Sequence, residues 1–252
     1  MSQKSKNKLE KVLLIPDCHV PYHDAKAFEL LLKVGKEFKP DHVIVGGDFA
    51  DFYSVSSHSK DPNRMLKFDW EIAETRKAIK QVADLGAKNN VFVSGNHESR
   101  LERYLQEKAP ELYNMVKIEE LFDLKKLKFT YIPYKQSYQL GKLNVTHDCG
   151  KAGAYAHYDA LNAFQHNIVI NHTHRIGYTV VGNAQNERHV GAMFGWLGDI
   201  EQVDYMHKIK AMRDWSLGFG IGYLDKATGN IYLTPVPIVN YTVVVEGKLF
   251  KV

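Results

Sequence analysis

Several short motifs in the sequence contain side chains that bind metal ions. They offer carboxylate, amide and imidazole groups, and the seven candidate ligands are Asp17, His19, Asp48, Asn96, His147, His172 and His174. A donor set without thiolate suits Mn²⁺, Fe, Zn²⁺, Co²⁺ or Mg²⁺ and differs from the cysteine-rich set of a closed structural zinc site. The sequence therefore predicts a catalytic metal centre, with Mn²⁺ as the first expectation.

The number of candidate ligands indicates two metal ions. A single catalytic ion takes three or four ligands from the protein and leaves a position open. Two ions that share a bridging carboxylate account for all seven candidates. A pair of cations about 3.5–4 Å apart activates a bridging hydroxide and holds phosphoryl oxygens during in-line displacement. The expected reaction is therefore the hydrolysis of a phosphate ester.

Each of these motifs follows a stretch that predicts a β-strand. The stretches are short and mostly apolar, and they cover residues 11–16, 42–45, 90–93, 143–146 and 168–170. In open α/β sheets, ligands bind outside the carboxyl ends of the strands. We therefore expect the loops that follow these strands to meet in one pocket, although their positions in the sequence are far apart.

The segments between the first strands predict helices. Asp24 can cap a helix over 27–35, a second helix covers about 65–85, and a third follows His97 and runs through Tyr104. Alternation of strand and helix predicts parallel pairing of these strands. In the second half of the chain only one helix is expected, near 155–164.

The C-terminal part predicts antiparallel strands and loops. The expected strands are 216–224, 231–234 and 241–245, with turns at 225–230 and at Gly247, and residues 54–64 and 184–189 are expected to be surface loops. We predict an α/β fold in which two mixed sheets form a β-sandwich flanked by helices. Because no linker or repeat is evident, the predicted organisation is a polar N-terminal leader, 1–10, and a single domain, 11–252.

Composition narrows the class of protein further. The chain has 252 residues, a formal net charge of +4 and only two cysteines, Cys18 and Cys149. The basic excess is too small to indicate nucleic-acid binding from charge alone. No apolar run approaches the roughly 20 residues that span a bilayer. These features predict a cytoplasmic protein that does not bind membranes.

Five ordered motifs, over roughly residues 11–240, resemble the calcineurin-like metallophosphoesterases. They are D-x-H at Asp17 and His19, G-D-x-x-D at Asp48 and Asp51, G-N-H-E at residues 95–98, a single histidine at His147, and H-x-H-R at residues 172–175. The resemblance implies the metallophosphoesterase fold and a hydrolase that uses two divalent metal ions. Five motifs in the family's order are far more specific than any one of them.

The resemblance also implies roles for individual residues. Asp17, His19 and His174 would hold one ion, Asn96, His147 and His172 would hold the other, and Asp48 would bridge them. His97 would face the substrate and help to protonate the leaving oxygen. Glu98 would orient His97, or it would be an ordinary carboxylate at a helix start. Asp51 would be a helix cap or would hold a ligand in place.

Two positions depart from the family's pattern. Asn171 stands where the family usually has glycine before its H-x-H pair, and Thr146 and Asp148 flank the middle histidine, where glycine is frequent. His157 and His166 are therefore alternatives to His147 as a ligand. We favour His147 because it directly follows a predicted strand, whereas the other two fall in or beside a predicted helix.

The sequence gives only local hints about the substrate. Phe52 and Tyr53 could stack on a nucleobase, and Arg100 and Arg175 could contact a phosphate, although an aromatic core and solvated arginines explain these residues equally well. We expect a phosphomonoesterase that acts on (deoxy)nucleoside monophosphates, a nucleotidase whose partner is a small phosphorylated substrate. The alternatives are a DNA or RNA nuclease or phosphodiesterase of the same family, and a binding protein with an inactive site.

Overall fold

The computed structural model describes residues 9–57, 60, 67–203 and 214–252. Most of the predicted N-terminal leader, the first residues of the helix expected at 65–85, and part of the loop expected at 54–64 lie outside the described residues. Within the described part of the chain, no helix is both long and apolar enough to cross a membrane.

The larger sheet has six strands in the order β11-β10-β1-β2-β3-β4. Strands β1 to β4 pair in parallel, which the sequence predicts for β1 to β3, and β10 and β11 add to the other edge in antiparallel orientation. The strands are β1 (Leu9–Ile15), β2 (His42–Val45), β3 (Asn89–Val93), β4 (Phe129–Ile132), β10 (Gly218–Asp225) and β11 (Ile231–Pro237). This arrangement places the ends of β1, β2 and β3 side by side.

The second sheet has five strands in the order β5-β6-β7-β9-β8, with β6, β7 and β9 parallel. Its strands are β5 (Tyr138–Leu140), β6 (Leu143–Val145), β7 (Asn167–Val169), β8 (Ile176–Gly182) and β9 (Arg188–Phe194). The sequence analysis missed β5 and the β8–β9 hairpin, and the loop expected at 184–189 is mainly the turn of this hairpin. The last hairpin joins β12 (Thr242–Val245) and β13 (Lys248–Lys251) through Gly247.

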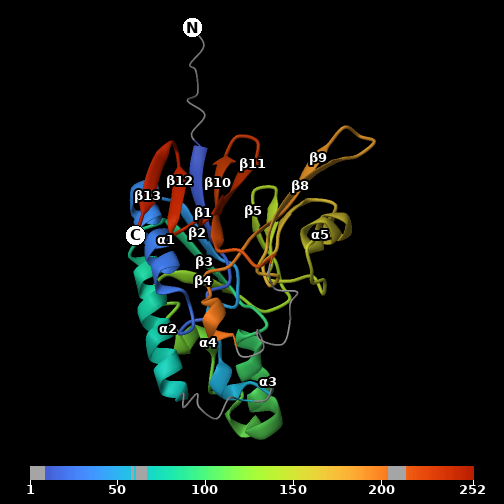
Figure 1. Cartoon of the computed structure of the whole chain (residues 1–252). Coiled ribbons are helices and arrows are strands. Elements are labelled where there is room, and N and C mark those ends of the chain that lie inside the picture. Colours follow the sequence, from blue (N-terminus) through green and yellow to red (C-terminus); the bar gives the residue numbers. More distant parts are fainter. Residues whose placement is uncertain (1–8, 58–59, 61–66, 204–213) are drawn as a thin grey trace.

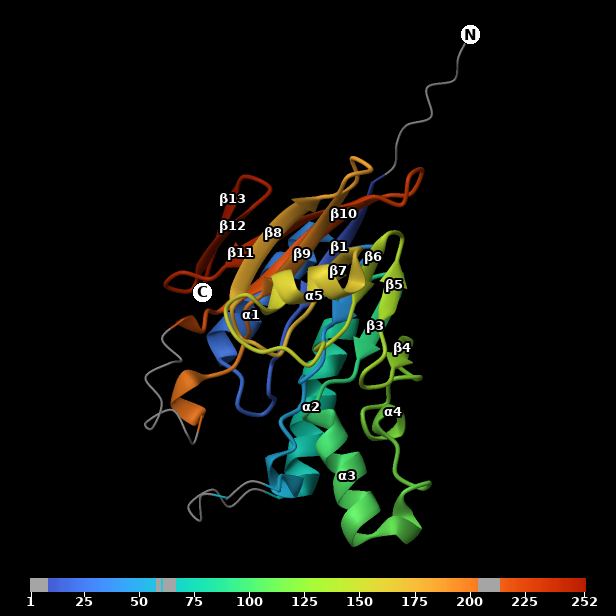
Figure 2. The ribbon, with the colours of Figure 1, turned by 90° about the vertical axis from the view of Figure 1, so that its right-hand side faces the viewer.

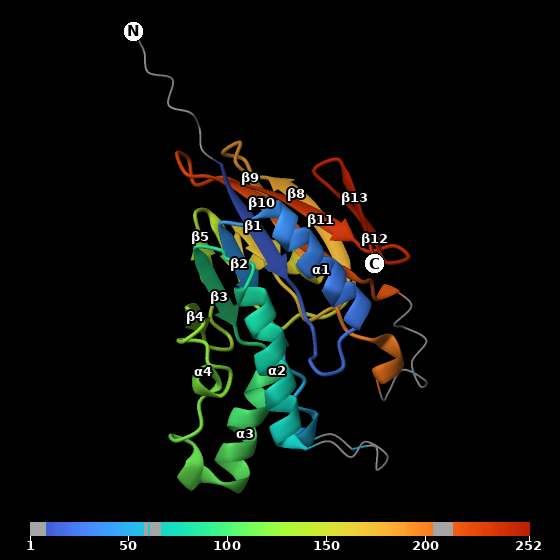
Figure 3. The same cartoon turned by 90° about the vertical axis from the view of Figure 1, so that its left-hand side faces the viewer.

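Helices cover the outer faces of the two sheets (Figures 1, 2 and 3). In Figure 3, α1 (Ala25–Phe38) and α2 (Phe68–Ala83) lie over the larger sheet, and in Figure 2, α5 (Ala156–Phe164) lies over the smaller one. The other α-helices among the described residues are α3 (Glu98–Lys108) and the short α4 (Ile118–Leu121), which was not predicted. Asp24 caps α1 as expected, because its Oδ1 accepts a hydrogen bond from the Ala27 amide at 2.9 Å.

Side chains alternate between the two faces along each strand of the larger sheet, and both faces are packed into a hydrophobic core. In β1, Leu13 and Ile15 pack against the helices, whereas Val12 and Leu14 pack against the second sheet. This pattern follows from the two-residue period of a strand, which sends successive side chains to opposite faces. The predicted α/β fold with two mixed sheets and flanking helices is confirmed.

Candidate metal centre

Loops from both sheets bring the seven candidate ligands together. Asp17 and His19 follow β1, Asp48 follows β2 and Asn96 follows β3, all in the larger sheet. The smaller sheet provides the remaining ligands, His147 after β6 and His172 and His174 after β7. The sandwich thus closes around a single site at the carboxyl ends of five parallel strands, as the rule for open α/β sheets anticipates.

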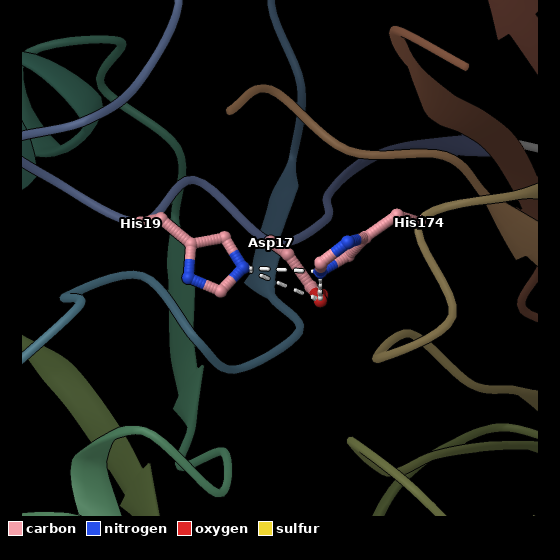
Figure 4. A group of neighbouring side chains, drawn as sticks. All are labelled: Asp17, His19 and His174. Carbon is pink, nitrogen blue, oxygen red and sulfur yellow. Dashed lines mark hydrogen bonds and ion pairs between the residues drawn. The ribbon is translucent and has the colours of Figure 1, made fainter. Parts of the chain in front are cut away.

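Asp17, His19 and His174 form the first cluster of converging donor atoms (Figure 4). The Nε2 atom of His174 lies 3.1 Å from Oδ2 of Asp17 and 3.1 Å from Nε2 of His19. Asp17 is completely buried, and its Oδ2 has no hydrogen-bond donor among the described residues. Two imidazole nitrogens beside a buried carboxylate oxygen fit a shared cation, because Oδ2 otherwise lacks a donor, whereas Oδ1 accepts from the backbone N–H of His172 at 3.2 Å.

Asp48, His147 and His172 form the second cluster. The Nε2 atom of His147 lies 3.2 Å from Oδ2 of Asp48 and 3.0 Å from Oδ1 of Asn96. The charge of Asp48 also acts on His19 and His174, which belong to the first cluster. Asp48 is therefore placed to serve both clusters, and this donor set fits a second divalent cation.

Four of the candidate ligands have a left-handed backbone. The φ angle is 55° at His19, 47° at Asp48, 67° at His172 and 58° at His174. This conformation is uncommon for residues other than glycine and costs on the order of 1–3 kcal/mol at each position. These four strained residues lie in the loops that follow β1, β2 and β7, where the chemistry is expected.

Glycines in the motifs allow the loops to approach one another closely. A Cβ atom on Gly95 would lie 2.2 Å from Oδ1 of Asp48, and one on Gly47 would lie 2.5 Å from Nδ1 of His147. Gly47 also has a φ of 97°, which favours glycine. The glycines before Asp48 and Asn96 therefore leave room for ligands that come from other loops.

The carbonyl of Gly46 orients His147. It accepts hydrogen bonds from Nδ1 of His147 and from Nδ2 of Asn171, both at 3.0 Å. Since Nδ1 donates to this carbonyl, Nε2 is free to face Asp48, as metal-binding histidines require. Asn171, which departs from the family's glycine, thus has a structural role: its buried amide links the β7 loop to the β2 loop.

Carboxylates make the buried site strongly attractive to cations. Burial opposes the charged form of His147, but Asp48 and Asp17 outweigh it and raise the pKa of His147 to about 10. His174 behaves differently, because burial lowers its pKa to about 4 despite the nearby Asp17. The site thus attracts positive charge through three buried or nearly buried aspartates, while some of its imidazoles stay neutral and able to bind metal.

A comparison with protein families now identifies the chain. The sequence model of the family described as calcineurin-like phosphoesterase matches residues 10–223, which is most of the chain. The chain belongs to the calcineurin-like phosphoesterase family. The resemblance inferred from the five motifs is therefore confirmed.

Relatives of this phosphoesterase occur in mycobacterial phages. The Gene 54 protein of Mycobacterium phage D29 is 27% identical over 260 residues, and the match covers 96% of this chain and 99% of the phage protein. The Gene 54 protein of Mycobacterium phage L5 is 25% identical over 262 residues, with the same coverage.

Solved structures are similar at lower identity. TT1561 of Thermus thermophilus is 10% identical, with a TM-score of 0.40 over 90% of this chain and 99% of that protein. Vps29 of Chaetomium thermophilum is 11% identical, also with a TM-score of 0.40, over 89% of this chain and 92% of that protein.

His97 of the phosphoesterase lies beside the clusters and is held by three neighbours. Its Nδ1 is 2.9 Å from the carbonyl oxygen of Asp51, and its backbone N–H donates to Oδ1 of Asp48 at 2.7 Å. Arg100 donates from Nη2 to Nε2 of His97 at 2.7 Å and from Nη1 to the carbonyl of Asp51 at 3.0 Å. Asp51 and Arg100 therefore fix the ring of His97.

Glu98 does not orient His97, contrary to one of the two expectations for it. It is fully buried, and its carboxylate accepts hydrogen bonds from the backbone amides of Asp48, Ala50 and Gly95 at 2.7–2.9 Å. Burial and the charge of Asp48 raise the pKa of Glu98 to about 7. Its position indicates a structural role, in which it joins the Asp48 loop to the Asn96 loop.

The residues expected to contact substrate are mostly engaged by the protein itself. Phe52 is 1% exposed and its ring stacks against Phe68 and Phe122, so the expectation that it binds a nucleobase is wrong. Tyr53 is half-buried and its ring lies 6.0 Å from that of Tyr22. The guanidinium of Arg175 contacts Asp214 and the carbonyl of Thr173, so it is already paired.

The alternative histidines lie elsewhere in the described structure. Nε2 of His157 is 2.9 Å from the hydroxyl of Thr179, and the ring of His166 packs against that of His189. Neither belongs to a donor cluster among the described residues. Two aromatic residues that the sequence analysis did not consider, Trp196 and Trp215, instead surround His174.

Proposed function

We propose that this phosphoesterase hydrolyses phosphate monoesters at a centre that holds two divalent cations. The observation that carries the proposal is the convergence of both donor clusters beside His97, whose Nε2 lies 3.7 Å from Oδ2 of Asp48. Asp17, His19 and His174 hold one cation, Asn96, His147 and His172 hold the other, and Asp48 serves both. When bound, the cations supply Lewis-acid stabilisation of the phosphoryl oxygens and an activated water.

His97 is the proton donor in this proposal. Its ring is held through Nδ1 by Asp51, so Nε2 faces the side of the site where Asp48 lies. In the described structure Nε2 accepts a hydrogen bond from Arg100, so Arg100 must release Nε2, and Nε2 must take up a proton, before His97 can protonate the leaving oxygen of the ester. Asn96, His97 and His172 are only partly buried, whereas Asp17, Asp48 and His147 are buried, so a substrate can reach His97 and two of the candidate ligands.

A small nucleotide is the substrate that we propose, in preference to nucleic acid. The two arginines expected to meet phosphate, Arg100 and Arg175, are both paired with aspartates, Asp51 and Asp214. Their charges are therefore largely neutralised, so these two arginines offer little attraction to a long polyanionic backbone. We also propose Mn²⁺ as the metal and the cytoplasm as the location, because the donor set lacks thiolate and the two cysteines are free.

A parallel screen of esters tests the proposal. The metal-depleted protein is loaded in turn with Mn²⁺, Fe²⁺, Zn²⁺, Co²⁺ and Mg²⁺ and given nucleoside monophosphates, bis(p-nitrophenyl) phosphate and oligonucleotides. We expect release of inorganic phosphate from the mononucleotides, fastest with Mn²⁺. Cleavage of oligonucleotides without phosphate release from mononucleotides would favour the nuclease alternative. Failure with every ester and every metal would favour an inactive binding protein.

A further inference from the structure

Two tryptophans line the His174 side of the metal centre. The ring of Trp196 stacks on His174 with centroids 4.6 Å apart and an interplanar angle of 16°. The ring of Trp215 meets His174 edge to face, with centroids 4.1 Å apart and an angle of 87°. The two indoles are themselves 4.9 Å apart. Aromatic surface thus lies directly beside a candidate ligand of the first cluster.

The two tryptophans differ in their exposure. Trp196 is 3% exposed and its backbone forms β-bridges with Asp17 and Leu217, so it is part of the core. Trp215, in contrast, is only partly buried. Trp196 already supports one face of the His174 ring, so the orientation of His174 does not depend on Trp215 alone.

Backbone hydrogen bonds and an ion pair hold Trp215 against the metal centre. The amide of Ser216 donates to the carbonyl of His174 at 2.9 Å, and the amide of Trp196 donates to the carbonyl of Ser216 at 3.1 Å. On the other side of Trp215, Asp214 binds the guanidinium of Arg175. Trp215 is thus fixed to the loop that carries His174. Stacking of a substrate ring on Trp215 therefore costs the protein little conformational entropy.

We propose that Trp215 forms a subsite that binds the planar ring of the substrate, so that the enzyme prefers phosphate monoesters that carry a nucleobase over aliphatic ones. This inference rests on the proposed function and adds the residue that selects the substrate. A partly exposed indole beside a phosphate-binding centre offers stacking to a nucleobase and nothing comparable to a sugar. Trp215 would thus contact the nucleobase in place of Phe52, which is buried.

Paired substrates and paired variants test this proposal. Adenosine 5′-monophosphate and ribose 5-phosphate share the reacting group and differ by the base. In Trp215→Ala we expect kcat/KM for the nucleotide to fall by about tenfold, mainly through KM, while kcat/KM for ribose 5-phosphate changes by less than about twofold. Trp215→Phe should recover most of the loss, and metal content should be unchanged. Trp70→Ala, at an exposed tryptophan on α2, is the control and should affect neither substrate.

The outcomes separate the subsite from the proposed function. If Trp215→Ala loses metal, or if it slows both substrates equally, then Trp215 only supports His174 and the proposal is overturned. If the wild-type protein hydrolyses neither ester, the proposed function fails, and calorimetric binding of both compounds decides about the subsite. Tighter binding of the nucleotide than of ribose 5-phosphate, lost in Trp215→Ala, would support the subsite, and equal binding in both proteins would overturn it.

Discussion

At the scale of single residues, Asp48 and His97 are neighbours with different tasks. Asp48 lies in the second donor cluster and is proposed to serve both, whereas His97 groups with His19 and Asp51 and its ring is held by Asp51 and Arg100. We expect Asp48→Asn to lose metal from both positions. His97→Ala should keep its metal and lower turnover by roughly 10²–10⁴, the usual contribution of general acid–base catalysis. Elemental analysis and steady-state rates of the purified variants check that Asp48 holds metal and that His97 does not. Equal metal loss in both variants would contradict this assignment.

Asn171 provides a second prediction at the residue scale. Its amide shares the Gly46 carbonyl with His147 and its backbone N–H donates to the His147 carbonyl at 2.9 Å. In Asn171→Ala we expect the affinity of the second position for metal to fall by about 10–100-fold, as is typical when a partner of a metal ligand is removed. Isothermal titration with Mn²⁺ measures the effect.

The control for this prediction lies on the neighbouring strand. Asn144→Ala removes an amide of β6 that donates to the carbonyl of Asn167 at 3.4 Å, so metal affinity should stay within about twofold of the wild type. An unchanged affinity in Asn171→Ala would show that Gly46 and His147 hold their geometry without Asn171.

The sequence predicted which side chains converge better than it predicted the residues that support them. The candidate ligands stand directly after strands, so the spacing of the motifs was enough to predict that they meet. Asp51 and Glu98 are both acids in these motifs, and only the folded structure shows that Asp51 contacts His97 while Glu98 binds backbone amides. Contacts between residues that are far apart in the chain, such as Trp215 with His174, leave no trace in local spacing.

At the scale of secondary-structure elements, burial decided which strands could be predicted. The strands that lead into the site are buried apolar runs, such as β2, in which all four residues are buried. In contrast, β8 is an edge strand with no buried residue and with glycines at both ends of its sequence, Gly177 and Gly182. Such a strand has no apolar run or clear alternation, so the β8–β9 hairpin was missed.

Asp41 joins three parallel strands at the end opposite the metal centre. Its carboxylate accepts from the Lys11 amide of β1 at 3.0 Å and from Nζ of Lys88, just before β3, at 2.7 Å. Asp41→Ala should lower the free energy of unfolding at pH 7 by about 1–2 kcal/mol, because a partly buried amide loses its acceptor. Lys88→Met is the matched control, and because Lys88 is exposed it should destabilise the protein distinctly less than Asp41→Ala.

The effect of Asp41 should depend on pH with a defined sign. The hydrogen bond from Lys88 lowers the pKa of Asp41 below its usual value of 3.8, despite partial burial. A carboxylate with a lowered folded-state pKa stabilises the protein above its unfolded-state pKa and loses this contribution as pH falls through the folded-state value. Urea denaturation from pH 7 to pH 3 should therefore show a constant difference in unfolding free energy between wild type and Asp41→Ala above about pH 5, and a difference that narrows below it. A difference in unfolding free energy between the two proteins that widens toward low pH would refute this account.

At the scale of the whole molecule, the metal centre lies between the two sheets. Asp17, Asp48 and Asn96 come from the larger sheet, and His147, His172 and His174 come from the smaller one. In the described structure the Gly46 carbonyl, after β2, already links the two sheets, because it accepts hydrogen bonds from His147 and Asn171 of the smaller sheet's loops. Cations bound by both clusters would add a second link and would offset the repulsion among the buried aspartates.

Metal binding should therefore stabilise the entire fold and not only the loops. A ligand that binds the folded state alone adds about 2.7 kcal/mol at a concentration of 100 times its Kd, and for a chain of this size that corresponds to a rise in Tm of about 5–10 °C. We expect this rise when Mn²⁺ is added to the metal-depleted wild type and to His97→Ala, measured by scanning calorimetry. Asp48→Asn should show little of it, because the residue that serves both clusters is lost. An equal rise in Asp48→Asn would place the stabilising ions outside the centre between the sheets.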